Sequence, residues 1–141
     1  MADIDKTTVQ LEICALDRAT PKLEATEVTV PGVMGLFVVL PGHAPLLANL
    51  EIGPLKATLA DGTLVAFAIN GGFARVLDNT VLILTQTVER HTDIDIDRAA
   101  AAKERAEQRL KKPSENLDVA RAEGSLRRAL TRLETAGHTE R

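Results

Sequence analysis

The sequence predicts a β-plus-α protein: an N-terminal antiparallel β-sandwich or barrel over residues 1–88, followed by a C-terminal antiparallel two-helix hairpin over residues 89–141. Short runs of alternating apolar and polar residues, separated by turn signals at spacings of about 8 to 12 residues, predict the β-domain. After Arg90, residues rich in Ala, Glu, Lys and Arg replace β-branched ones, which predicts helix. With 141 residues, 45% of them hydrophobic, the chain can form one packed core and a small appendage.

Three strands are predicted in the first part of the chain, over residues 8–16, 24–30 and 36–40. The first alternates with a period of two, so that Cys14 falls on the polar face. The second is expected to stop at Pro31-Gly32, since proline lacks the backbone donor that a sheet requires.

Turn signals divide the next part of the chain. Asp61-Gly62 predicts a two-residue type I′ hairpin, because that turn needs φ > 0 at both central positions. Asn70-Gly71-Gly72 is expected to end a strand, and Asp78-Asn79 to separate two more. The strands expected around these turns are residues 55–59, 64–69, 73–77 and 80–85.

The first helix is predicted from small apolar residues on one face. Asp95 or Asp93 is placed to cap its amino end, and it should end before Pro113, because proline disfavours helix in the preceding residue. The residues of that face are Ala99, Ala102, Ala106 and Leu110.

A second helix is expected to start at Ser114 or Asn116 and to stop at Gly137. Taken together, the two helical faces are mostly alanine. A buried methyl-sized group contributes only about 0.8 kcal/mol. The hairpin should therefore be weakly held and able to change position, as a switch does. The seam of the second helix is Val119, Ala122, Leu126, Ala129, Leu133 and Ala136.

Composition excludes several classes of function. A net charge of −3 with 2% aromatic residues provides neither a basic field nor a stacking surface for nucleic acid. No window approaches the roughly 18 apolar residues of a membrane span, and the amino terminus lacks the pattern of a signal peptide. A single cysteine cannot form an internal disulfide, which fits a reducing compartment.

The sequence offers little catalytic chemistry. It has no phosphate-binding G-x-x-x-x-G-K-[ST] loop and no C-x-x-C pair, and its three histidines show no metal-ligand spacing. His43 is interpreted as a loop residue that hydrogen-bonds its neighbours, and Cys14 as a packing or surface residue rather than a nucleophile. A small hydrolase or isomerase would need a pocket with titratable residues, for which no motif is present.

Asp93, Asp95 and Asp97 match the start of a calcium-binding EF-hand loop, and Glu104 falls at its twelfth position. Arg98, however, occupies the sixth position, where that loop needs glycine for a sharp turn. The acidic residues are therefore interpreted as a favourable helix amino terminus, and no metal site is predicted.

A stiff loop with two prolines follows the strand over residues 36–40, and we call residues 40–45 the proline loop. With the preceding Gly-Leu-Phe-Val-Val it resembles the signature loop of the epsilon subunit of the rotary F-type ATP synthase. The resemblance extends over almost the whole chain, through residues 70–73 and 94–99. The sequence departs from the family pattern at two positions. The family usually has glycine where this chain has Val38, and often an acidic residue where it has Leu36. The loop consists of Leu40, Pro41, Gly42, His43, Ala44 and Pro45.

This resemblance implies a non-catalytic central-stalk subunit that couples ion-driven rotation to ATP synthesis. Its β-domain would bind the gamma subunit and the c-ring through the proline loop, and its arm would inhibit ATP hydrolysis by reaching the alpha and beta subunits. It would lie at the cytoplasmic face of the bacterial plasma membrane without inserting into it. The arm residues expected to meet acidic surfaces are Arg105, Arg109, Arg121, Arg127 and Arg128.

The same resemblance implies a regulatory ATP site, although no cofactor is required. Arginines four residues apart share one helix face and can donate to phosphate oxygens, while carboxylates accept from ribose or adenine. Two alternatives stay open: a solvated charged face, and a free-standing ATP-sensing module that acts on another partner and does not migrate with gamma. The implied site comprises Glu89, Ile94, Asp95, Arg98, Ala99, Arg128 and Arg132.

Overall fold

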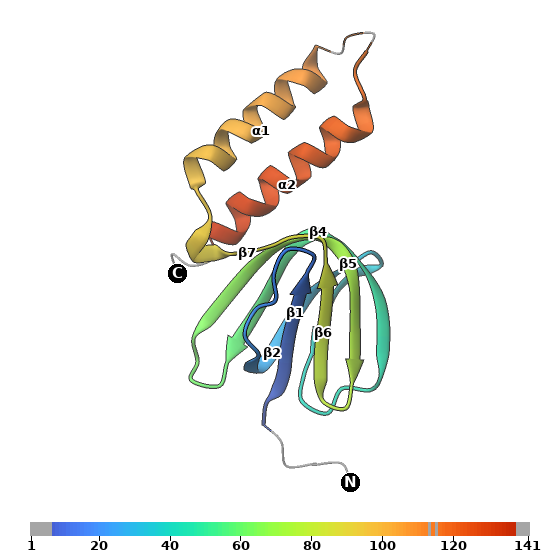
Figure 1. Cartoon of the computed structure of the whole chain (residues 1–141), viewed down its shortest axis with the longest axis vertical. Helices are drawn as coiled ribbons and strands as arrows, with labels where there is room; N and C mark the ends of the chain where they lie inside the picture. Colours follow the sequence, from blue (N-terminus) through green and yellow to red (C-terminus); the bar gives the residue numbers. More distant parts are fainter. Residues whose placement is uncertain (1–6, 113, 115, 138–141) are drawn as a thin grey trace.

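The computed structural model describes residues 7–112, 114 and 116–137. It consists of a β-barrel and a two-helix arm that lies across one end of it (Figure 1), which confirms the predicted fold class. The elements are β1 (Val9–Ala15), β2 (Leu23–Gly32), β3 (Gly35–Val39), β4 (Leu46–Leu59), β5 (Leu64–Leu77), β6 (Thr80–Thr85), β7 (Val88–Arg90), the 3-10 turn η1 (His91–Asp93), α1 (Ile96–Lys111) and α2 (Val119–Gly137).

The barrel closes through five strands in the order β1-β6-β5-β4-β2, and a short antiparallel pairing of β1 with β2 completes the ring. Strand β3 extends the sheet beyond β2, and β7 pairs with β5. One pairing differs from the predicted antiparallel arrangement: β1 runs parallel to β6, with Leu11 opposite Val81. The alternation along a strand carries no information about the direction of its neighbour.

The core consists of the inward faces of these strands. Val9, Leu11 and Ile13 are each 1% exposed, as the alternation predicts, and Cys14 is exposed on the outer face. Strand β2 ends at Gly32, so it includes the Pro31-Gly32 pair at which the sequence predicts its end. Both residues belong to β2 and pair with the start of β3, because a proline is tolerated at the end of a strand beside a hairpin.

The Asn70-Gly71-Gly72 segment does not end a strand, contrary to the prediction. Strand β5 passes through it with φ of 73° at Gly71 and 116° at Gly72, and there its neighbour on one side changes from β7 to β6. A Cβ atom at Gly72 would lie 1.9 Å from the carbonyl oxygen of Leu84. The glycines therefore allow a continuous strand to bend between two partners.

The type I′ turn lies at a different place from the predicted one. At Asp61-Gly62 only the glycine has a positive φ, and the Gly62 N–H donates to Leu59 O at 2.9 Å, so the connection is a longer loop closed by a glycine. Asp78 and Asn79 both have positive φ, 49° and 58°, and join β5 to β6 in two residues. Asparagine and aspartate tolerate this conformation better than other non-glycine residues.

The two helices begin at aspartate caps. Asp95 Oδ1 accepts from Arg98 N at 3.1 Å, so Asp95 rather than Asp93 caps α1. The prediction that α2 starts at Ser114 or Asn116 is wrong: the helix starts at Val119, and Asp118 Oδ1 accepts from Arg121 N at 3.0 Å. Asp118 comes just before the apolar seam of α2, which is a known N-cap signal, but the prediction did not use it.

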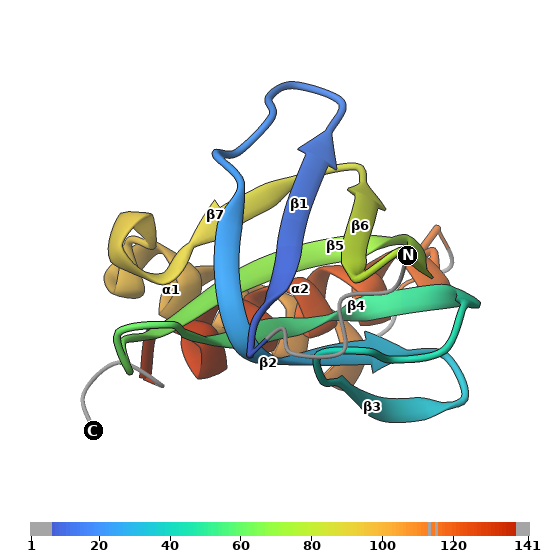
Figure 2. The same cartoon turned by 90° about the horizontal axis from the view of Figure 1, so that it is seen from below.

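Alanines form the contact between the helices, as predicted. Val119, in the first turn of α2, is 49% exposed and is the exception among the predicted seam residues. Helix α2 also contacts β4, β5 and η1, and Figure 2 shows it running along the β4–β5 pair. The buried alanines are Ala99 and Ala106 of α1 and Ala122, Ala129 and Ala136 of α2.

Candidate functional site

Among the described residues, three ion pairs join α2 to the barrel. Arg127 Nη2 lies 3.0 Å from Glu51 Oε2, and Lys56 Nζ lies 3.9 Å from Glu134 Oε1. The third pair, between Arg132 and Glu89, is part of the pocket described next. Charged pairs therefore hold α2 on the barrel around a small apolar contact. Two polar residues of α2, Thr131 and Thr135, are buried.

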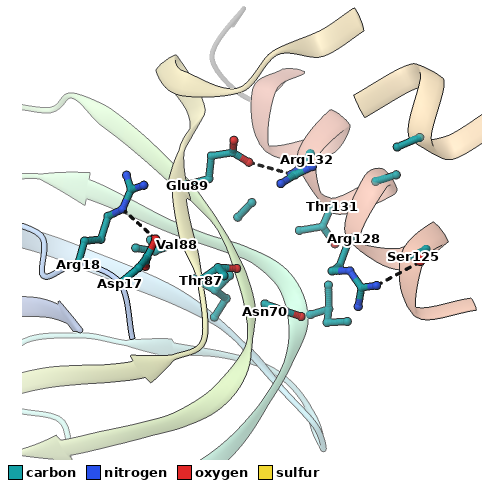
Figure 3. Close-up of a pocket in the computed structure, with 15 residues that line it drawn as sticks. Asp17, Arg18, Asn70, Thr87, Val88, Glu89, Ser125, Arg128, Thr131 and Arg132 are labelled. Atoms are coloured by element: carbon teal, nitrogen blue, oxygen red, sulfur yellow. Dashed lines mark hydrogen bonds and ion pairs between the residues drawn. The ribbon is translucent and has the colours of Figure 1, made fainter. Parts of the chain in front are cut away.

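A pocket of about 390 Å³ lies between α2 and the barrel (Figure 3). The barrel side carries Asn70 of β5, Thr87 before β7 and the β1–β2 loop (residues 16–22), and the helix side carries two arginines. Three of the seven residues implied for ATP binding line this pocket, namely Glu89, Arg128 and Arg132.

Glu89 and Arg132 already bind each other in this state. Arg132 Nε lies 2.9 Å from Glu89 Oε1, and that oxygen is buried from solvent. The carboxylate enters from β7 and the guanidinium from α2, so the pair connects the last barrel strand to the arm. A phosphate that binds Arg132 must therefore compete with this carboxylate.

Arg128 has a different environment. Its Nη2 donates to Ser125 Oγ at 3.2 Å, and no carboxylate of the described residues lies within 4.0 Å of it. Gly124 leaves room for this side chain, since a Cβ there would lie 3.3 Å from Arg128 Nη1. The glycine that lowers helix propensity in α2 therefore also accommodates Arg128, which has no acidic partner among the described residues.

The other four residues of the implied site do not line the pocket. The Asp95 side chain caps α1, Ala99 is 1% exposed between the helices, Arg98 is exposed, and Ile94 lies in the link before the cap. With the arm in this position, the structure brings together the carboxylate and the two arginines of the site but not its I-D-x-x-R-A segment.

The proline loop lies at the end of the barrel away from the arm (Figure 1). Gly42 has φ of 81°, and its N–H donates to Asn79 Oδ1 at 3.0 Å, which fastens the loop to the β5–β6 turn. His43 Nδ1 lies 2.6 Å from Ala44 O and donates to it, as expected of a loop histidine that bonds its neighbours. Leu40 is 51% exposed.

Sequence reasoning missed an apolar patch on the outer face of the barrel. Phe73 and Leu84 are cross-strand partners of β5 and β6 and are 57% and 48% exposed. The exposed Leu47 and Leu77 lie on the same outer face, Leu77 on the far side of Arg75 from Phe73 and Leu47 opposite Arg75. The signal was present as apolar residues at the outward positions of alternating strands. It also missed four pocket residues that only the topology brings together: Asp17, Arg18, Asn70 and Thr87.

The predicted partner-binding arginines of the arm are all exposed. Arg105 and Arg109 lie one turn apart on the outer face of α1, and Arg121 lies in the first turn of α2. Arg127 is occupied by Glu51 while the arm lies on the barrel.

Among the described residues, no three His, Cys, Asp or Glu side chains are grouped to hold a metal ion, and this includes Asp93, Asp95 and Asp97. Neither of the two helices, over the residues described, is long and apolar enough to cross a membrane.

Family models match both parts of the chain. The ATP synthase delta/epsilon chain β-sandwich domain matches residues 8–91, and the delta/epsilon long α-helix domain matches residues 92–137. The ATP synthase epsilon chain of Moorella thermoacetica is 42% identical to this chain, over 92% of this chain and 97% of its own length. The ATP synthase epsilon chain of Nitratidesulfovibrio vulgaris is 44% identical, over 93% of this chain and 97% of its own length.

Solved structures agree. A chain of the Euglena gracilis mitochondrial ATP synthase (OSCP/F1/c-ring) is 25% identical with a TM-score of 0.76, covering 96% of this chain and 83% of that one. A central stalk and c-ring structure of the Tetrahymena thermophila mitochondrial enzyme shares the fold at a TM-score of 0.54 and 17% identity, over 94% and 96%. The chain therefore belongs to the ATP synthase delta/epsilon family, which confirms the resemblance to an epsilon subunit.

Proposed function

We propose that this chain is a non-catalytic central-stalk subunit that couples ion-driven rotation to ATP synthesis and inhibits ATP hydrolysis through its helical arm. The observation that carries the proposal is the arm itself, an alanine-seamed helix pair held on the barrel by three ion pairs among the described residues, of which Arg127–Glu51 and Lys56–Glu134 lie at the surface. Exposed ion pairs contribute only about 0.2–1 kcal/mol each. A partner can therefore draw the arm away at modest cost.

Two barrel surfaces are proposed to bind the other stalk components. The relatives' names and the solved neighbours refer to ATP synthase, to its central stalk and to its c-ring. The proline loop, fixed by Asn79, and the apolar patch of Leu47, Phe73, Leu77 and Leu84 are exposed and pre-formed. These surfaces would bind gamma and the c-ring. The chain would then lie at the cytoplasmic face of the membrane through the complex rather than in the bilayer.

The extended arm is proposed to lie along gamma and to reach the alpha and beta subunits. Arg105, Arg109 and Arg121 are exposed already in the docked state, and Arg127 becomes available when it leaves Glu51. In a catalytic complex depleted of its own epsilon chain, replacing these four arginines by glutamine should relieve inhibition of ATP hydrolysis. The control variant with Lys103→Gln and Lys111→Gln, which removes charge from α1 only, should still inhibit ATP hydrolysis. Equal inhibition by both variants would refute the role of the arginines.

ATP is proposed to bind with its phosphates at Arg128 and Arg132. Two guanidinium groups one helical turn apart on a pocket of about 390 Å³ support this, and Arg128 is without an acidic partner among the described residues. Calorimetric titration of the full chain with ATP should give binding that Arg128→Gln weakens at least tenfold and Arg121→Gln leaves unchanged. Equal affinity in both variants would place any nucleotide elsewhere.

The alternative of a free ATP-sensing module makes a different prediction. It requires the chain to stay apart from gamma in size-exclusion chromatography, whereas the stalk proposal requires the two to migrate together. Replacing Phe73 by serine should then weaken the co-migration, because that exposed ring, opposite Leu84, belongs to the apolar patch and not to the core.

A further inference from the structure

A second pocket opens on the other side of the β1–β2 loop. It has a volume of about 240 Å³ and lies where that loop faces β7 and the root of the arm. Arg18 and Val88 line this pocket as well as the first one, so the two are neighbours (Figure 3 shows both residues). None of the residues implied for ATP binding lines it.

The floor of this pocket is apolar and comes from the barrel core. Phe67 is 3% and Val88 5% exposed, and Leu23 and Pro21 extend the apolar wall at the start of β2. The pocket lies where the β1–β2 loop borders β2 and β7, two described strands that do not pair with each other. An apolar floor of this kind gains free energy when a ligand displaces water from it.

The rim of the pocket is charged. Arg90, at the end of β7, has no carboxylate within 4.0 Å among the described residues, and Arg18 has only a long contact of 3.6 Å to Asp17, with both side chains more than half exposed. Asp93 of η1 is the single acidic residue of the lining. Two guanidinium groups against one carboxylate favour an anion, and guanidinium also stacks on flat apolar groups.

We propose that this pocket binds a small carboxylate with a flat apolar body. Its carboxylate would lie on Arg90 and Arg18, and its body against the apolar wall formed by Pro21 and Leu23 with the accessible edges of Phe67 and Val88. The site adjoins the first pocket through Arg18 and Val88, but it includes none of the seven residues implied for ATP binding and does not depend on the assignment of function. An occupant would contact the β1–β2 loop together with Arg90 and Asp93, and it would therefore tie the barrel to the root of the arm.

The test uses the full chain and naphthoate as a probe, because naphthoate has this shape and charge and the chain itself has no Trp or Tyr to obscure its fluorescence. The expected dissociation constant is about 1 mM or tighter. Amide chemical-shift changes in NMR should be confined to residues 18–23, 67 and 88–93. The neutral analogue naphthamide should bind at least tenfold more weakly.

Variants distinguish binding at this site from non-specific binding of naphthoate elsewhere on the protein. Arg18→Ala with Arg90→Ala should weaken naphthoate binding at least tenfold, Asp93→Asn should strengthen it, and Arg75→Ala, an exposed arginine on the outer face of β5, should change nothing. Shift changes centred on Phe73 and Leu84, affinity unaffected by the double arginine variant, or equal binding of naphthamide would each overturn the proposal.

Discussion

Glu51→Gln is expected to loosen the arm without unfolding either part of the protein. The substitution removes the charge that holds Arg127 but leaves a side chain of nearly the same shape at a half-exposed position of β4. Neither residue belongs to the barrel core or to the alanine seam. The expected change is therefore in the position of the arm rather than in the stability of the fold.

The size of the effect follows from the geometry of the pair. Arg127 Nη2 and Glu51 Oε2 are 3.0 Å apart, and the side chains are 51% and 40% exposed, so solvent screens the attraction. Pairs of this kind contribute about 0.2–1 kcal/mol, which changes the ratio of released to docked arm by roughly 1.4- to 5-fold. Added salt should produce a similar change in the unmodified chain and a smaller one in the variant.

The arm's position can be measured as a distance between two labels. Cys14 is exposed on the barrel and is the only cysteine, so a second cysteine at Lys112, which is exposed at the end of α1 farthest from the barrel, completes a labelled pair. Pulsed electron paramagnetic resonance then reports the docked and released populations. Glu51→Gln should increase the released population.

Glu107→Gln is the matched control, because it removes the same charge from a pair with Lys103 that lies within α1 and does not reach the barrel. This control should leave the populations unchanged. Equal populations in Glu51→Gln, Glu107→Gln and the unmodified chain would refute the view that ion pairs decide the docking.

Three further predictions concern a glycine of β5, the N-terminal cap of α1 and a carboxylate in the β4–β5 loop. Gly72→Ala should lower the free energy of unfolding by at least ~2 kcal/mol in urea titrations, because its Cβ would meet Leu84 O at 1.9 Å and φ is 116°, whereas Gly137→Ala, with open space around it, should have little effect. Asp95→Ala should destabilise α1 by about 1 kcal/mol, seen as faster hydrogen exchange in its first turns, and Asp95→Asn should restore most of the protection; equal exchange in both variants would contradict the capping role. Hydrogen bonds from Thr63 lower the pKa of the Asp61 carboxyl from its ordinary value of 3.8, so its stabilising contribution is present above that value and is lost as the pH falls through the lowered pKa. Asp61→Asn should therefore reduce the loss of stability between roughly pH 5 and pH 2, and an unchanged pH profile would exclude this carboxylate as a source of it.

The fold could be predicted in class and largely in its elements, because alternation and helical spacing are local properties of the sequence. The errors arose where local signals have two meanings. Asn70-Gly71-Gly72 indicates a turn, yet in β5 the glycines let one strand exchange neighbours close to the Leu84 backbone. The parallel pairing of β1 with β6 depends on chain topology, which no window of residues contains.

The candidate site could be predicted only in part for the same reason. Arg128 and Arg132 are detectable because their spacing places them on one helix face. Their barrel-side neighbours Asn70 and Thr87 are ordinary polar residues in sequence and become pocket residues only when α2 lies on β4 and β5. The Arg132–Glu89 pair likewise depends on the docked arm.

The central claim is that the arm must leave the barrel to inhibit ATP hydrolysis. Lys56→Cys and Glu134→Cys, in a chain with Cys14→Ser, replace the two residues of another ion pair between β4 and α2. A cleavable thiol crosslinker between these two cysteines holds the arm in its docked position. Added to a catalytic complex depleted of its epsilon chain, the crosslinked protein should bind without suppressing ATP hydrolysis, and cleavage of the crosslinker should restore suppression. Equal suppression before and after cleavage would contradict the claim.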